Sequence, residues 1–114
     1  MKKSFTVLGQ KVKIKFHKRV LELNGSLVYG YYDLDLKEIH IGHHFTYQSF
    51  LETIVHELGH LLCQRSGLRQ TSLTKDIEEM VVDNYSKLIF ELFKPQLEKW
   101  FPEKDFLKLY PPQK

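Results

Sequence analysis

The spacing of apolar residues changes once along the chain, near Gly42, and this change limits the fold more than any other feature. Before Gly42, apolar side chains alternate with polar ones, as Val12, Ile14 and Phe16 alternate with lysines. A period of two predicts half-buried strands. After Gly42 the period lengthens to about 3.6 residues, which is the repeat of an α-helix. The sequence therefore predicts an α+β fold in which a small antiparallel sheet precedes the helices.

Turn residues divide the expected sheet into short strands. The turns are expected at Gly9-Gln10, Asn24-Gly25 and residues 33–37. The strands are expected within residues 5–16, 27–32 and 38–41. Lysines that alternate with the buried positions are typical of the solvent side of such a sheet, so this stripe does not indicate a nucleic-acid site.

Two helices are expected after the sheet. The first begins at Ser49 through a capping box, or alternatively at Thr46, and ends at Ser66-Gly67. Its expected buried face consists of Leu51, Ile54, Val55, Leu58, Leu61 and Leu62. The second helix begins near Thr74 or Asp76 and is interrupted at Pro95. Its expected inward face consists of Ile77, Val81, Tyr85, Leu88 and Leu92.

The rest of the chain is an aromatic, amphipathic segment, which we expect to cover the core rather than to recruit a partner. With 114 residues the chain forms a single domain, residues 1–114. The 17 basic and 14 acidic side chains leave a net charge of +3, which requires neither a nucleic-acid nor a membrane partner. The N-terminus lacks a signal-peptide pattern, and the single cysteine excludes an internal disulfide. A cytoplasmic protein is therefore expected.

The first helix contains the sequence His56-Glu57-Leu58-Gly59-His60, an HExxH motif. Residues four apart lie on one helical face, so both imidazoles can reach one tetrahedral Zn²⁺ ion. Glu57 is too close to the histidines in sequence to bind the same ion readily as a third ligand, but it is well placed to act as a general base for a metal-bound water molecule. The alternative is an amphipathic helix that carries these residues by chance, which would place polar groups beside a buried stripe at a cost.

No histidine follows His60, so a third protein ligand has to be a downstream carboxylate. If the two helices are antiparallel neighbours, Glu79 is level with His60, and Asp83 is level with His56 as an outer partner. Because Glu78 is adjacent to Glu79, the sequence leaves open which of the two residues is the third ligand. We choose Glu79 as the ligand and expect Glu78 to take no part in the site, so that its replacement is nearly silent.

These residues resemble a known family. The HELGH sequence, followed by Glu79, Asp83 and Tyr85 in one motif, is similar to the gluzincin arrangement and to the small ImmA/IrrE-like metallopeptidases, including phage-encoded relatives. The resemblance covers about residues 28–93, although Val82 and Ser86 replace two alanines of the family motif. It implies a minimal zincin core and a zinc-dependent endopeptidase that acts on a protein or peptide substrate.

In that interpretation His56, His60 and Glu79 bind zinc and Glu57 is the catalytic base. Candidates for a second oxyanion stabiliser are Tyr31, Tyr32, Tyr47, His40, His43 and His44. The alternative function is a non-catalytic, zinc-stabilised binding or accessory module. Such a module has no use for the intact base Glu57, and structural zinc sites are usually closed by four ligands.

Overall fold

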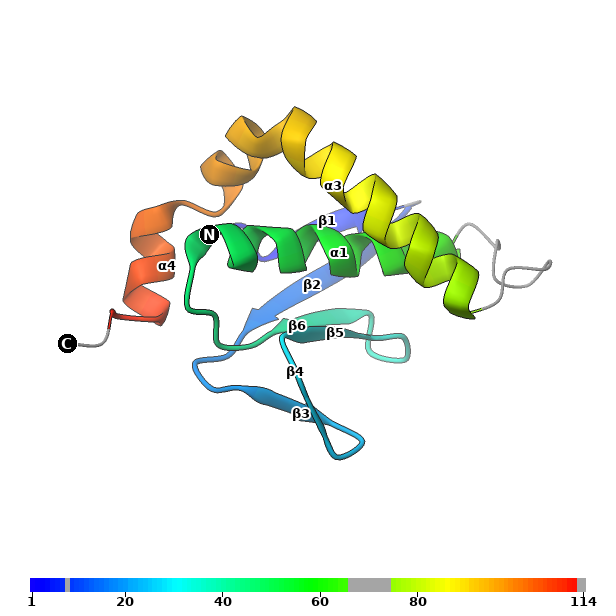
Figure 1. The fold of residues 1–114 in the computed structure, drawn as a ribbon, viewed down its shortest axis with the longest axis horizontal. Coiled ribbons are helices and arrows are strands. Elements are labelled where there is room, and N and C mark those ends of the chain that lie inside the picture. Colours follow the sequence, from blue (N-terminus) through cyan, green and yellow to red (C-terminus); the bar gives the residue numbers. More distant parts are fainter. Residues whose placement is uncertain (8, 66–74, 113–114) are drawn as a thin grey trace.

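The computed structural model describes residues 1–7, 9–65 and 75–112, and it has the mixed α+β architecture that the change of period predicts. The strands are β1 (Ser4–Val7), β2 (Gln10–Phe16), β3 (Leu21–Leu23), β4 (Ser26–Val28), β5 (Gly30–Asp33) and β6 (Glu38–Ile41). The helices are α1 (Tyr47–Arg65), α3 (Lys75–Trp100) and α4 (Glu103–Leu109). Helix α1 contacts β5 and β6 on one side and α3 on another, so it is the central element (Figure 1). Within the described residues, no helix has the length and apolar character needed to cross a membrane.

The main sheet has four strands in the order β1-β2-β6-β5. The expected antiparallel hairpins are confirmed for β1–β2 and β5–β6. Between them β2 and β6 pair in parallel, with Ile14 opposite Ile39, which the sequence did not predict. The expected strand at 27–32 is divided into β4 and β5. Strand β4 pairs with β3 in a separate hairpin, where Asn24 and Gly25 have φ angles of 52° and 82°, as a two-residue hairpin turn requires.

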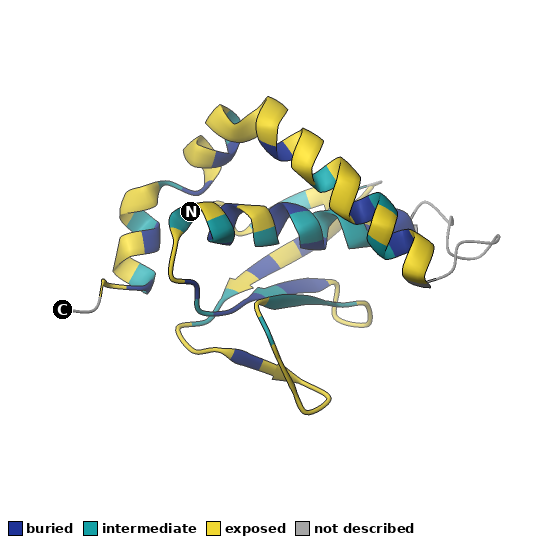
Figure 2. Cartoon of the chain, in the orientation of Figure 1, coloured by how far each residue is buried: buried dark blue, intermediate teal, exposed yellow. Residues whose placement is uncertain are grey.

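The sheet packs against α1 through β5 and β6, and buried and exposed residues alternate along β2 (Figure 2). Val12 and Ile14 are buried, whereas Lys11, Lys13 and Lys15, which alternate with them, are exposed, and this confirms the predicted alternation in β2. Within the described residues, the core combines side chains from the sheet, from α1, α3 and α4 and from the segments next to α4: Val12, Ile14, Ile39, Ile41, Phe50, Leu51, Ile54, Val55, Leu61, Phe90, Leu97, Phe101, Phe106 and Tyr110.

Helix α1 begins at Tyr47, and the Ser49 backbone N–H donates to Thr46 Oγ1 at 3.2 Å. Thr46 is therefore the capping residue, the alternative of the two expected starts. The predicted buried face is confirmed at Leu51, Ile54, Val55 and Leu61 and partly at Leu58. It is wrong at Leu62, which is 48% exposed. The stop expected at Ser66-Gly67 lies outside the described residues.

The predicted inward face of α3 is wrong. Ile77, Tyr85, Leu88 and Leu92 are between 42% and 63% exposed, and Val81 is only partly buried. The buried residues of this helix are instead Glu78, Val82, Phe90 and Leu97. The apolar residues of α3 extend around much of its circumference, so periodicity alone does not determine its rotation.

The contact with α1 determines that rotation. A Cβ atom added at Gly59 would lie 3.1 Å from Cγ1 of Val82 and 3.4 Å from Oγ of Ser86, so α3 packs against the bare backbone of α1 there. Val82 and Ser86 are four residues apart and share one face of α3. Glu78 precedes Val82 by four residues, so it lies on the same face of α3 and is buried with it.

The C-terminal segment covers the core as expected. Helix α3 is interrupted at Phe93 (φ −115°, ψ 15°), two residues before Pro95, and then continues to Trp100. Beyond it Phe101, Phe106 and Tyr110 are buried. The Tyr110 hydroxyl lies 2.7 Å from the carbonyl oxygen of His17 and 2.6 Å from that of Gly42, and it donates its proton to this pair.

We expect Tyr110→Phe to lower the free energy of unfolding by about 1–3 kcal/mol, because the change removes the donor while the ring continues to fill its site. Urea denaturation measures this loss. Tyr29→Phe is the matched control, because the Tyr29 side chain is 60% exposed and its hydroxyl can be hydrated in either variant. Equal stability of the Tyr110→Phe variant and the wild type would contradict the structural role of the hydroxyl.

Stability should also fall at alkaline pH. Burial raises the pKa of Tyr110 to about 12, and burial together with Glu98 and Glu103 raises the pKa of Tyr47 to about 12. A tyrosine in the unfolded chain loses its proton near pH 10, whereas the folded protein retains both protons up to about pH 12. The free energy of unfolding therefore decreases as pH rises from about 10 to 12. Urea titrations at several pH values should show a shallower decrease for Tyr110→Phe than for the wild type.

Candidate metal centre

Helix α1 presents two imidazole rings at one point. His56 and His60 are one turn apart, their ring centroids are 4.8 Å apart, and their planes are inclined by 74°. Their Nε2 atoms lie 3.1 Å from each other. The uninterrupted α-helix over Tyr47–Arg65 therefore holds the two rings in the arrangement that the HExxH spacing predicts.

Helix α3 adds a carboxylate to this pair. Glu79 Oε1 lies 2.9 Å from Nε2 of His60, and Glu79 Oε2 lies 3.7 Å from Nε2 of His56. One ligand atom from each of the three residues lies within 4.8 Å of the other two. Tetrahedral zinc with bonds of about 2.0–2.1 Å separates its ligand atoms by about 3.3 Å. The two Nε2 atoms are 3.1 Å apart, close to this value, and the Glu79 carboxylate lies near both of them, so the three side chains could hold a zinc ion.

Two further carboxylates face the other nitrogen of each ring. Glu78 Oε2 lies 2.9 Å from Nδ1 of His60, and Asp83 Oδ1 lies 3.4 Å from Nδ1 of His56. An ionised carboxylate only accepts hydrogen bonds, so these contacts favour the tautomer with the proton on Nδ1. The lone pairs of the two Nε2 atoms then point toward each other and toward the Glu79 carboxylate. This set of donor atoms is suited to a cation.

The structure brings together the residues chosen from the sequence, but it corrects the expectation for Glu78. That side chain is 1% exposed and its Oε2 atom lies 2.9 Å from Nδ1 of His60, so we expect its replacement to affect the site. The cause is the rotation of α3, which turns Glu78 and Val82 toward α1. Glu78 precedes the apolar positions Val82 and Phe90 by four and twelve residues, and this helical spacing is the signal in the sequence that could have identified it.

Glu57 follows His56 directly in α1 and is buried, 9% exposed, among the candidate metal ligands. The pKa of its carboxyl is raised to about 7, mainly by burial, with His60 lowering the pKa and the charge of Glu79 raising it. A carboxyl group with a pKa near neutrality can accept and release a proton near pH 7. The environment of Glu57 therefore suits a group that transfers protons.

Several candidates for oxyanion stabilisation have other partners. The Tyr47 hydroxyl donates to the backbone carbonyl of Phe101. Both ring nitrogens of His44 are hydrogen-bonded, to Gly42 O at 2.9 Å and Thr53 Oγ1 at 2.8 Å. His40 contacts His17 at 2.9 Å and Glu38 at 3.3 Å, Tyr31 stacks on His40, and His43 packs edge-on against Tyr110. These contacts assign His44 and Tyr47 to packing within the fold.

Comparisons of the chain with protein-family models, with curated proteins and with solved structures gave no match.

Measured zinc affinities should distinguish the roles of the three acidic residues of α3 that contact the histidines. We expect Glu79→Ala to lose most zinc binding, since it removes an atom that faces the ion. Glu78→Ala and Asp83→Ala should each weaken binding about 10- to 100-fold, because each removes the partner that orients a histidine ring. Competition with a chromophoric chelator measures the affinities. Glu98→Ala, on the same helix but outside the cluster, should bind zinc as the wild type does, and an equal affinity in Glu78→Ala would contradict the role of that carboxylate.

Proposed function

We propose that this protein is a zinc-dependent endopeptidase with a minimal zincin core, in which His56, His60 and Glu79 hold the metal. The observation that carries the proposal is the convergence of these three side chains beside the buried carboxyl group of Glu57. The HELGH sequence, its place on a helix and the carboxylate from a second helix together support the resemblance to ImmA/IrrE-like metallopeptidases.

The residues of the chain account for the proton transfers of peptide hydrolysis. Zinc bound to three protein ligands supplies a Lewis acid that polarises a peptide carbonyl and activates water. Glu57 accepts a proton from the water molecule as the water oxygen bonds to the carbonyl carbon. Glu57 then delivers that proton to the amide nitrogen as the carbon–nitrogen bond breaks, so the products are a carboxylic acid and an amine.

Two observations favour catalysis over a closed structural site. In the described part of the chain, the group of side chains that could hold a metal contains three members, which is the number of protein ligands typical of catalytic zinc. Glu57 is also buried, and this burial destabilises its charged form and raises its pKa. A structural site gains nothing from such a residue.

The second candidate function is a zinc-stabilised binding module, and the exposed apolar face of α3 favours it. Tyr85, Leu88 and Leu92 are between 48% and 63% exposed. An apolar groove of about 640 Å³ runs between α1 and α3 beside this face, with Leu62 and Trp100 in its lining. Contiguous apolar surface of this kind often marks a protein contact.

The variant Glu57→Gln distinguishes the two functions. The amide has nearly the same shape as the carboxyl but cannot accept the proton, so we expect the fold and the zinc content to be retained and hydrolysis to fall by at least about 100-fold. The measurement is digestion of a proteome-derived peptide library by zinc-loaded protein, with new peptide termini identified by mass spectrometry.

The His56→Ala, His60→Ala double variant is the control without metal and should show neither zinc nor cleavage. Cleavage by Glu57→Gln at the wild-type rate would contradict the role of Glu57. A zinc-loaded wild type that cleaves no peptide would instead support the binding module.

A further inference from the structure

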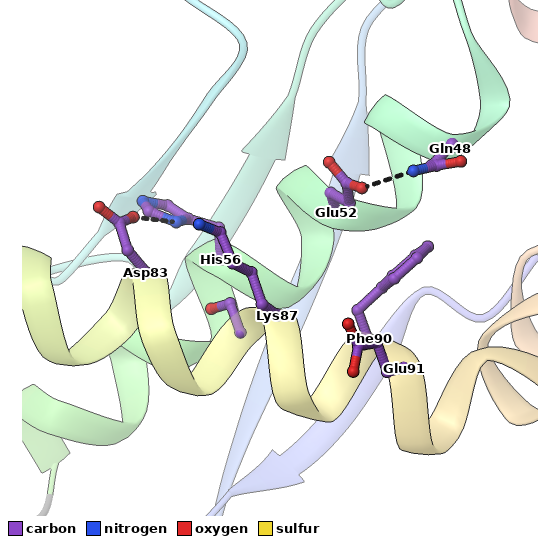
Figure 3. A pocket seen from close by; sticks show the side chains of 8 residues that line it. Gln48, Glu52, His56, Asp83, Lys87, Phe90 and Glu91 are labelled. Carbon is purple, nitrogen blue, oxygen red and sulfur yellow. Dashed lines mark hydrogen bonds and ion pairs between the residues drawn. The ribbon is translucent and has the colours of Figure 1, made fainter.

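A cavity of about 370 Å³ adjoins the candidate metal centre, between α1 and α3 (Figure 3). His56 forms part of its wall, so a group that enters the cavity lies next to a metal-binding side chain. The cavity is separate in character from the apolar groove between the same helices, because most of its lining side chains are polar or charged.

The two helices give the cavity a defined direction. Gln48, Glu52 and His56 follow one another at intervals of four along α1, and therefore form one stripe. Asp83 and Glu91 lie eight residues apart on the facing side of α3. The cavity thus extends about 12 Å along α1 from His56 toward the N-terminus of that helix, at 1.5 Å per residue.

The cavity lining combines one aromatic side chain with several acidic side chains. Phe90, which is 9% exposed, supplies an aromatic ring to the wall. Glu52, Asp83 and Glu91 supply carboxylates, and Lys87 is the single cation among the lining residues. The Glu52 carboxylate accepts a hydrogen bond from the uncharged amide of Gln48 at 3.0 Å. The lining therefore carries an excess of negative charge.

We propose that this cavity is a substrate subsite that selects a lysine or arginine side chain next to the scissile bond, an inference that rests on the proposed peptidase function. The aliphatic part of such a side chain packs against Phe90, and its charged end reaches Glu52 and Glu91. A neutral side chain of the same length gains only the apolar contact. The charge difference is the source of selectivity.

Binding of two small ligands tests the subsite without requiring catalysis. N-acetyl-L-lysine hydroxamate and N-acetyl-L-norleucine hydroxamate carry the same zinc-binding group and side chains of similar length, but the lysine compound has a charged amine at its end. Calorimetry with the zinc-loaded full-length chain should give an affinity about 10-fold higher for the lysine compound. In the double variant Glu52→Gln, Glu91→Gln this ratio should fall to about one, while the affinity for the norleucine compound changes less than about twofold.

Glu98→Gln, on α3 outside the cavity, is the matched control and should preserve the 10-fold ratio. Equal affinity of the wild type for both hydroxamates would overturn the subsite and leave the peptidase proposal intact. An unchanged ratio in the double variant would overturn the assignment to Glu52 and Glu91. If neither hydroxamate binds to protein that retains its zinc, the metal lacks an open position, and the peptidase proposal fails together with the subsite.

Discussion

The close contact between α1 and α3 at Gly59 is the constraint on which the candidate centre depends. Glycine in a helix interior costs about 1 kcal/mol relative to alanine. At position 59 the glycine lets Val82 approach so closely that a Cβ atom on residue 59 would crowd the valine side chain. The approach places the short Glu79 side chain 2.9 Å from His60, so a backbone contact inside the HExxH motif determines whether the second helix can complete the site.

The same contact concentrates negative charge. Glu57 and Glu78 are buried near the two histidines, and Glu79 and Asp83 approach from the more exposed side. Burial of carboxylates is unfavourable unless they are hydrogen-bonded or neutralised, and each neighbour of like charge adds to the cost. A divalent cation among these groups would relieve the repulsion, and its binding would then be energetically linked to the packing of α3 against α1.

Segments remote from the motif hold this helix pair in place. The interruption of α3 at Phe93 lets the chain turn so that Phe101, Phe106 and Tyr110 cover the N-terminal part of α1. The Tyr110 hydroxyl then ties the C-terminal segment to the loops that follow β2 and β6. The N-terminal half of α1 is thus fixed by aromatic packing, while its C-terminal half carries the histidines and contacts the start of α3. The cavity beside His56 extends along the N-terminal half of α1.

The sequence by itself determined what a local repeat or turn signal can determine: the alternation in β2, the turn at Asn24-Gly25, the existence of α1 and the position of His56 and His60 on one face. The helical spacing also related Glu79 and Asp83 to these histidines. Only the tertiary structure decided the parallel pairing of β2 with β6 and the rotation of α3 that buries Glu78 and exposes Tyr85. The physical reason is that α3 carries apolar side chains around most of its circumference, so its own periodicity allows more than one inward face. The contact with Gly59 and the bond from His60 to Glu78 select one of them.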